Sequence, residues 1–195
     1  MSHVDPWDPE AFETRYARQT DPWNFASSSY EQGRYDAMSA ALTRDRYVRA
    51  LEPGCAEGVF TERLARRAGQ VEAFDASPSA VARARHRCRA LPGVRCRVGD
   101  LRRLRPSGRF DLIVLAEVGY YFSADELVAI GGRLHDAATA RAELLAVHWN
   151  GSSEDHRLHA ATVHEVLRSL WGPPDLQRSL PGFRLDRWSL GREAR

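Results

Sequence analysis

The sequence predicts an α/β fold with one mostly parallel, seven-stranded sheet. Residues 110–116 form an apolar run that is typical of a strand buried on both faces. A glycine turn at residues 52–58 joins a strand-like segment to a segment with helical spacing of apolar residues. Two more short strand-like segments, 70–74 and 94–98, end beside an acidic residue. Alternating strands and helices of this kind predict a parallel sheet with helices packed against it.

The predicted elements follow one another in a regular order. Residues 1–45 are expected to form a helical lid, with a helix at 30–42, and residues 46–195 the core of a single domain. Five core strands are predicted at 46–51, 70–74, 94–98, 110–116 and 142–149. Core helices are predicted at 60–68, after Ser77 with Pro78 in the first turn, from Ser123 to 136, and at 155–171. Segments 176–180 and 183–190 predict a closing hairpin.

The glycine turn indicates the kind of ligand that the fold holds. Gly54 allows a sharp turn, and Gly58 allows the helix start to lie close to a ligand. Glu52 sits two residues before the first glycine, where a negative charge would repel a pyrophosphate and attract an ammonium group. This pattern favours S-adenosylmethionine, whose methionine end carries an ammonium. Cys55 and Ala56, inside the turn, are expected to contact the same ligand.

Acidic residues follow the ends of the predicted strands in order. Asp75 ends the second strand, 17 residues after Gly58, where a carboxylate can accept hydrogen bonds from both ribose hydroxyls. Asp100 follows the third strand and Glu117 the fourth. Because parallel strands end at one edge of the sheet, these acids are expected to border one site, together with their neighbours Ala76 and Leu101.

These residues resemble the class I methyltransferases that use S-adenosylmethionine. Motif I is similar to residues 52–58, the ribose acid to Asp75 and the adenine-side acid to Asp100. A narrower resemblance is to the nodulation protein S family of small N-methyltransferases, which act on an amino sugar during lipo-chitooligosaccharide synthesis. It rests on Phe12-Glu-Thr-Arg-Tyr16, Asp21-Pro-Trp23-Asn-Phe25, Ser29-Tyr30-Glu31-Gln-Gly-Arg34-Tyr35, Glu117-Val-Gly-Tyr120-Tyr121 and His148-Trp149. The match runs from about residue 12 to 150, and the segment 151–174 departs from the family.

The resemblance implies a Rossmann-like class I methyltransferase core and methyl transfer to an amine of a small polar acceptor. The expected acceptor is an amino sugar or an aminoglycoside-like intermediate in secondary metabolism, such as antibiotic biosynthesis. Two alternatives remain open from the sequence. One is a small-molecule O-methyltransferase, and the other is a non-catalytic protein that binds S-adenosylmethionine.

Three residues are the predicted catalytic group. Glu117 occupies the place where amine methyltransferases have an Asn/Asp-Pro-Pro-Tyr turn, and its charge could stabilise the cationic nitrogen that forms. The alternative is that Glu117 only contacts the cofactor. Tyr120 and its neighbour could wall the transfer cavity, or belong to the core. His148, at the end of the fifth strand, could remove an ammonium proton, or be a buried histidine satisfied by backbone.

Three residues of the predicted lid are expected to lie over the cofactor. They are Trp23, Tyr30 and Arg34, and Arg34 could pair with the methionine carboxylate through a bidentate fork. The alternative for this segment is helix packing with an exposed arginine.

Composition argues against several other functions. All 28 basic residues are arginine, so the absence of lysine excludes Schiff-base chemistry and a P-loop nucleotidase. Residues 83–109 carry ten arginines, but their spacing and the lack of interleaved aromatic residues predict no nucleic-acid partner. His156 and His159 have the spacing of one helix face, yet no metal site is predicted. Three cysteines without metal spacing predict a reducing, cytoplasmic setting, and no apolar run is long enough to span a membrane. The protein is expected to be a monomer or a homodimer.

Overall fold

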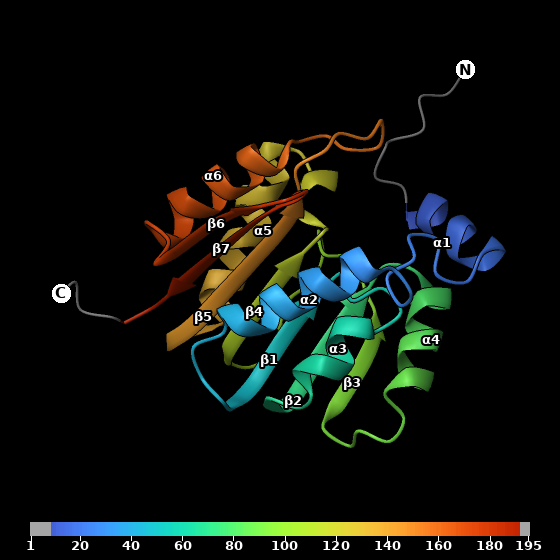
Figure 1. Ribbon diagram of the computed structural model, residues 1–195. Helices are drawn as coiled ribbons and strands as arrows, with labels where there is room; N and C mark the ends of the chain where they lie inside the picture. The colour runs from blue at the N-terminus through green and yellow to red at the C-terminus, as the bar shows by residue number, and fades with distance from the viewer. Residues whose placement is uncertain (1–8, 192–195) are drawn as a thin grey trace.

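The computed structural model describes residues 9–191 and contains the predicted α/β fold (Figure 1). Seven strands form one sheet in the order β3-β2-β1-β4-β5-β7-β6. The first five pair in parallel, and β7 runs antiparallel to both β5 and β6. The strands are β1 (Tyr47–Pro53), β2 (Ala68–Asp75), β3 (Val94–Val98), β4 (Phe110–Ala116), β5 (Ala138–Trp149), β6 (Leu176–Leu180) and β7 (Phe183–Ser189). The expectation of a mostly parallel sheet with a C-terminal hairpin is confirmed.

Helices cover both faces of the sheet. Helices α2 (Ser29–Ala41), α3 (Val59–Leu64) and α4 (Pro78–Arg87) lie on one face, and α5 (Ala124–Ala137) and α6 (Ala160–Trp171) on the other. Helix α1 (Pro9–Arg18) lies beside α4 near the carboxyl ends of the strands (Figure 1). Leu112 and Ile113 of β4 point to opposite faces and are both fully buried, as the apolar run predicted. The core therefore lies on both sides of the central strands.

Two predicted helix starts have the expected caps. The Ser77 hydroxyl accepts a hydrogen bond from the Ala80 N–H at the start of α4. Ser123 and Glu126 form a reciprocal capping box at the start of α5. These caps fix where each helix begins after the strand that precedes it.

Three element boundaries differ from the predictions. Helix α3 ends at Leu64, and Ala68, predicted to be helical, begins β2. Strand β5 begins at Ala138, directly after α5, and a register shift next to β4 accommodates the extra residues. Helix α6 begins only at Ala160, because the backbone N–H groups of Arg157 and Leu158 donate to the Tyr120 carbonyl instead of forming helical bonds. His156 and His159 are therefore not on one helix face.

Only the first part of the predicted lid lies over the carboxyl edge of the sheet. Met38 of α2 is fully buried with Tyr35 against the sheet, so α2 belongs to the helical layer. Helix α1 and the turn after it lie over the carboxyl edge of the sheet, and the boundary at residue 45 stays a prediction. Between residues 9 and 191, no helix has the length and apolar character needed to cross a membrane.

The strand order marks the place for a ligand. Strands β2 and β3 lie on one side of β1, and β4 and β5 on the other. The connections after β1 and β4 therefore leave the sheet in different directions, which opens a crevice at the carboxyl ends of these strands. Residues 54–58 and 117–121 follow these two strands.

Candidate functional site

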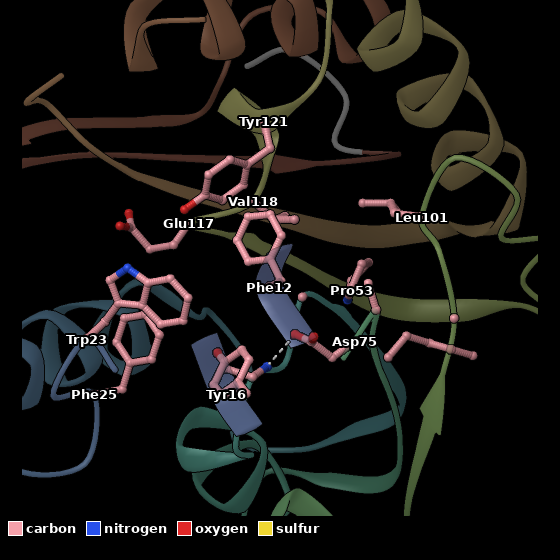
Figure 2. A pocket seen from close by; sticks show the side chains of 15 residues that line it. Phe12, Tyr16, Trp23, Phe25, Pro53, Asp75, Leu101, Glu117, Val118 and Tyr121 are labelled. Carbon is pink, nitrogen blue, oxygen red and sulfur yellow. Dashed lines mark hydrogen bonds between the residues drawn. The ribbon is translucent and has the colours of Figure 1, made fainter. Parts of the chain in front are cut away.

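A cavity occupies this crevice (Figure 2). We call it the inner cavity. Four of its residues, Gly54, Asp75, Gly99 and Glu117, come from the ends of four parallel strands. Its complete lining is Phe12, Tyr16, Trp23, Phe25, Pro53, Gly54, Ala56, Phe74, Asp75, Ala76, Gly99, Leu101, Glu117, Val118 and Tyr121.

The glycine turn brings the backbone close to this cavity. Gly54 has a φ of +77°, and a Cβ on it would lie 3.0 Å from the Val118 Cβ. Ala56 has a φ of +47° although it is not glycine, which is the kind of backbone strain that accumulates at functional sites. Gly58 also has a positive φ, but the atoms that exclude a Cβ there belong to Ala84 of α4. Gly58 therefore allows α3 and α4 to pack, and its contact with a ligand stays a prediction.

Replacing Gly54 with alanine is expected to destabilise the protein by about 1–3 kcal/mol. The methyl group would disfavour the positive φ and would crowd Val118. Gly132→Ala is the matched control, because Gly132 lies inside α5 and a Cβ added there would meet no neighbouring element within 4 Å. Denaturant unfolding of both variants measures the difference. Equal free energies of unfolding would contradict the close approach at Gly54.

Asp75 lies at the inner cavity and is anchored by backbone donors. Its carboxylate accepts hydrogen bonds from the N–H groups of Ala56 and Ser77, each at 2.9 Å; the first is the dashed line in Figure 2. Burial raises the pKa of Asp75, and these backbone donors oppose the shift. Its neighbour Ala76 also lines the cavity. Asp75 therefore connects the glycine turn with the start of α4.

Two residues that were predicted to bind the cofactor, Asp100 and Glu52, do not line the inner cavity. Leu101 lines the inner cavity, but Asp100 does not, and its carboxylate accepts from the Arg102 N–H. Glu52 points toward α3, where Thr61 donates a hydrogen bond to it. Burial raises the pKa of Glu52 to about 8, so most of this carboxyl is protonated at pH 7. Glu52 does not line the inner cavity, and its attraction of an ammonium stays a prediction.

Glu52 and Cys55 instead line a smaller cavity. This small cavity lies between α2 and the glycine turn and shares Phe25, Gly54, Ala56 and Glu117 with the inner cavity. Cys55 is buried and free, as are the other two cysteines. The predicted turn residues are thus divided between two adjoining spaces.

Aromatic side chains from the N-terminal segment cover the inner cavity. Phe12 and Tyr16 lie one turn apart on α1, and both contact Trp23. The Asp21 side chain accepts hydrogen bonds from the N–H groups of Phe25 and the next residue, which fixes the turn that carries Trp23. The sequence predicted Trp23 at this place, but not Phe12, Tyr16 and Phe25. The spacing of four residues between Phe12 and Tyr16 could have indicated those two.

Glu117 and Phe25 line all three neighbouring cavities, and of these two residues Glu117 is the one that carries a charge. Both line the inner cavity, the small cavity and a third space, which we call the outer cavity. The residues of the outer cavity are Arg15, Trp23, Phe25, Tyr30, Glu31, Arg34, Glu117, Tyr120, Tyr121, Trp149, Ser152, Ser153, Asp155 and His156. Glu117 has a φ of +56°, a second strained non-glycine residue at the site.

The Glu117 carboxylate is held by three donors. It accepts from the Tyr120 hydroxyl at 2.8 Å and from the Trp149 N–H at 2.6 Å, and it lies 2.9 Å from Arg34 Nη1. Burial raises the pKa of Glu117, and Arg34 opposes the shift most strongly. Tyr120 therefore acts on Glu117 directly, and its ring also stacks on His156 with centroids 3.7 Å apart.

Arg34 is buried between two carboxylates. One of its terminal nitrogens contacts Glu117 and the other contacts Glu31, one turn earlier on α2. The predicted bidentate fork is therefore already engaged by protein groups, and the alternative of an exposed arginine is wrong. Tyr30 lies in the outer cavity, where it packs edge-on against Phe183, and does not reach the inner cavity.

His148 is fully buried and lines none of these cavities. Its Nε2 accepts the Gly119 N–H at 3.1 Å, and its Nδ1 lies 3.1 Å from Nε2 of His164. His164 Nδ1 in turn lies 2.8 Å from Asp186, which also binds Arg184. Burial lowers the pKa of His148 well below its ordinary value, and His164 adds to the shift. With both nitrogens engaged, His148 does not fit the predicted role of a base that faces the acceptor.

No group of three or more histidine, cysteine or acidic side chains within residues 9–191 has the arrangement of a metal site. His156 stacks on Tyr120 in the outer cavity, and His159 precedes α6 on the surface.

The sequence also matches a family model. The model of nodulation protein S (NodS) matches residues 11–147. The chain belongs to the NodS family. Nodulation protein S of Sinorhizobium fredii is 37% identical over 117 residues, which are 60% of this chain and 53% of that protein. The Bradyrhizobium diazoefficiens protein is 40% identical over 102 residues, which are 52% of this chain and 49% of the relative. This NodS-family chain thus spans about half the length of the curated relatives that it matches.

Solved structures agree with the family and the fold. A candidate methyltransferase from Pseudomonas syringae is 33% identical and has a TM-score of 0.74, covering 83% of this chain and 99% of that one. The N-methyltransferase NodS of Bradyrhizobium japonicum WM9, in complex with S-adenosyl-L-homocysteine, has a TM-score of 0.84. That pair covers 97% of this chain and 100% of the other, and at 22% identity it shows the shared fold. The predicted class I methyltransferase fold is confirmed.

The segment that matches the family model contains the whole inner cavity but only part of the outer cavity. All lining residues of the inner cavity lie between residues 12 and 121, inside the matched segment. Five residues of the outer cavity, Trp149, Ser152, Ser153, Asp155 and His156, lie beyond it. The inner cavity is therefore the part that this NodS-family member shares with the family model, and one wall of the outer cavity is outside the match.

Proposed function

We propose that this protein transfers a methyl group from S-adenosylmethionine to an amine of a small polar acceptor. The observation that carries the proposal is the position of Glu117, which lines both the family-matched inner cavity and the adjoining outer cavity. A residue in that position contacts the space for a donor and the space for an acceptor. Methyl transfer requires these two reactants to meet at attack distance.

The inner cavity has the groups that S-adenosylmethionine requires. Asp75 offers carboxylate oxygens to ribose hydroxyls, and Ala76 and Leu101 offer apolar surface for adenine. The turn at Gly54 exposes backbone near the expected methionine end, where the buried Nε of Arg34 has no hydrogen-bond partner among the described residues. When bound, S-adenosylmethionine supplies a methyl group that its sulfonium already activates. The protein contributes position, charge and exclusion of water.

Glu117 is the proposed electrostatic residue of the reaction. An amine that attacks a methyl group becomes a cation, and a nearby carboxylate lowers the energy of that developing charge. Tyr120 and the Trp149 N–H hold the carboxylate in place. Phe12, Tyr121 and Trp23 limit water around the reactants.

The outer cavity supports an amino sugar or aminoglycoside-like acceptor. Tyr30 and Trp149 offer partly exposed aromatic faces, and Ser152 and Ser153 offer hydroxyl groups. A role in secondary metabolism and a cytoplasmic location are part of the same proposal; the three buried free thiols are consistent with a reducing compartment. An O-methyltransferase with His148 as its base has less support, because neither nitrogen of this buried histidine faces a cavity.

Product analysis tests the reaction. The protein, S-adenosylmethionine and either D-glucosamine, an aminoglycoside or N-acetyl-D-glucosamine would be incubated together, and the product mass and methylated position determined. We expect methylation on nitrogen for an acceptor with a free amine, and none for the acetylated control. Methylation on oxygen would contradict the amine assignment. Binding of the cofactor without turnover across a broad amine panel would favour a non-catalytic binding protein.

Asp75→Ala is expected to weaken the binding of S-adenosylhomocysteine by about 1.5–3 kcal/mol, or roughly 10- to 150-fold. The ribose hydroxyls would lose a charged acceptor, and the Ala56 N–H would lose its anchor. Asp100→Ala is the matched control, because Asp100 follows the adjacent strand but does not line the cavity. Titration calorimetry on both folded variants measures the effect. Unchanged affinity in Asp75→Ala would contradict the proposed cofactor position.

A further inference from the structure

Glu31 is a buried carboxylate that faces the outer cavity. It lies in the first turn of α2, one turn before Arg34. Its Oε2 contacts one terminal nitrogen of Arg34, whose other terminal nitrogen lies 2.9 Å from Glu117. Two carboxylates from different parts of the chain thus share one guanidinium. With both acids ionised, this group of three carries a net charge of −1.

Among the described residues that line the outer cavity, no second cation is free to balance this negative charge. Arg15, the other arginine of the outer cavity, pairs with Asp155 at 2.8 Å. Asp21, in the turn before α2, raises the pKa of Glu31 further. The other titratable groups around the site are uncharged near neutral pH, because burial raises the pKa of each tyrosine and lowers that of the histidine: Tyr30, Tyr35, Tyr120, Tyr121 and His156.

Aromatic faces accompany the two carboxylates. The Arg34 guanidinium carbon lies 5.9 Å from the centroid of Tyr30 and 6.0 Å from that of Phe25. Trp149, whose N–H binds Glu117, is 36% exposed beside the same cavity. Carboxylates with aromatic faces nearby are the surroundings that an ammonium group prefers. A neutral hydroxyl gains less from the excess negative charge.

We propose that Glu31 and Glu117 form a cation site where the outer and inner cavities meet, and that Glu31 accepts the proton of an ammonium acceptor. This inference rests on the proposed methyl transfer. In the proton-transfer step one N–H bond of the ammonium breaks, its electron pair stays on nitrogen, and the proton binds a Glu31 carboxylate oxygen. The neutral amine can then attack, while Glu117 keeps its charge and faces the nitrogen that becomes cationic.

The protonation behaviour of Glu31 suits this task. Burial raises the pKa of Glu31 to about 7, Arg34 opposes the shift, and Glu117 adds to it. A carboxyl that titrates near pH 7 is partly ionised at neutral pH and can both take and release a proton. A bound cation stabilises the ionised form and lowers this pKa. Binding of a cation near pH 7 should therefore release protons from the protein.

Two cofactor analogues test the cation site without a known acceptor. Sinefungin carries an amine, cationic at neutral pH, where S-adenosylmethionine carries its methyl-sulfonium, and S-adenosylhomocysteine has no cation there. We expect the protein to bind sinefungin about tenfold more tightly or better at pH 7.5. The preference should fall as pH drops from 8 to 6. Calorimetry in buffers of different ionisation enthalpy should show proton release with sinefungin and little with S-adenosylhomocysteine.

Three variants assign the effect to Glu31. Glu31→Gln keeps the size and the contact with Arg34, and it should lower the preference for sinefungin about fivefold or more and abolish the proton release. Glu31→Asp keeps the charge and should retain part of the preference for sinefungin and part of the proton release. Glu165→Gln is the matched control for net charge, because Glu165 is exposed on α6. Circular dichroism checks that each variant folds.

The outcomes separate this inference from the proposed function. If Glu31→Gln folds, binds S-adenosylhomocysteine normally and keeps the full preference and proton release, Glu31 is not part of a cation site. If Glu31→Asp behaves like Glu31→Gln, charge at this position is not the cause, and the proposal is overturned. If the unaltered protein binds neither analogue, the proposed cofactor is wrong, and the inference that depends on it is rejected with it.

Discussion

Glu117→Gln is expected to lower turnover by about 10- to 1,000-fold while changing the affinity for S-adenosylhomocysteine less than about threefold. Glutamine keeps the size of the side chain, and its single amide oxygen can still accept from either Tyr120 or the Trp149 N–H. It removes the charge that faces the nitrogen as the nitrogen becomes cationic. Because this charge matters most in the transition state, the rate should suffer more than ground-state binding.

The measurement pairs initial rates on a methylated amine with calorimetry on the same preparations. Glu165→Gln again serves as the control for net charge and should retain the rate. Equal turnover in Glu117→Gln and the unaltered protein would remove the electrostatic role. A parallel loss of turnover and S-adenosylhomocysteine affinity would instead indicate that Glu117 mainly supports the cofactor site, which Arg34 also borders.

The strands and their ends were predictable because local chemistry determines them. A run such as 110–116 can be buried only as a central strand, and polar residues must follow where it leaves the core. Parallel strands then bring Gly54, Asp75 and Glu117 to one edge, and the structure has all three at the inner cavity. The β5 start was missed because residues 138–141 pair through a register shift, which depends on the neighbouring strand.

Side-chain partners far apart in the sequence were not predictable. Glu31, three residues before Arg34, is within reach on the same helix, but nothing local indicates that Glu117 occupies the other end of the guanidinium. The surroundings of Glu52 were not predictable for a similar reason, since its burial and its hydrogen bond with Thr61 depend on how α3 packs. A sequence gives the type of each group, whereas its protonation depends on surroundings that only the fold assembles.

The largest revision concerns His148, which we now infer to be a positioning residue. It holds the Gly119 N–H in the short turn, Gly119–Tyr121, that follows Glu117 and carries Tyr120. Its own ring is oriented by His164 and, through it, by Asp186. A histidine at a strand end could have been a base or a buried structural group, and the partners of its two nitrogens favour the second.

His148→Ala is expected to lower the free energy of unfolding by about 2–5 kcal/mol, because it leaves a cavity and unpaired groups on Gly119 and His164. His148→Gln, whose amide oxygen can replace Nε2 as the acceptor, should lose less. Turnover should fall in His148→Ala by a factor that is constant across pH and recover partly in His148→Gln. A catalytic base would give a different result, a deficit near neutral pH that disappears at alkaline pH.

The pH dependence of stability gives a second readout of the same residues. Burial lowers the pKa of both His148 and His164 in the folded state, so the neutral forms stabilise the fold. This stabilisation is complete above the unfolded-state pKa of about 6.5 and is lost as pH falls below it, by up to about 1.4 kcal/mol per pH unit for each histidine.

Denaturant unfolding at pH 5 and 7.5 should show a smaller loss in His148→Gln than in the unaltered protein. An unchanged pH dependence in His148→Gln, or a turnover deficit that alkaline pH repairs, would restore His148 as a base.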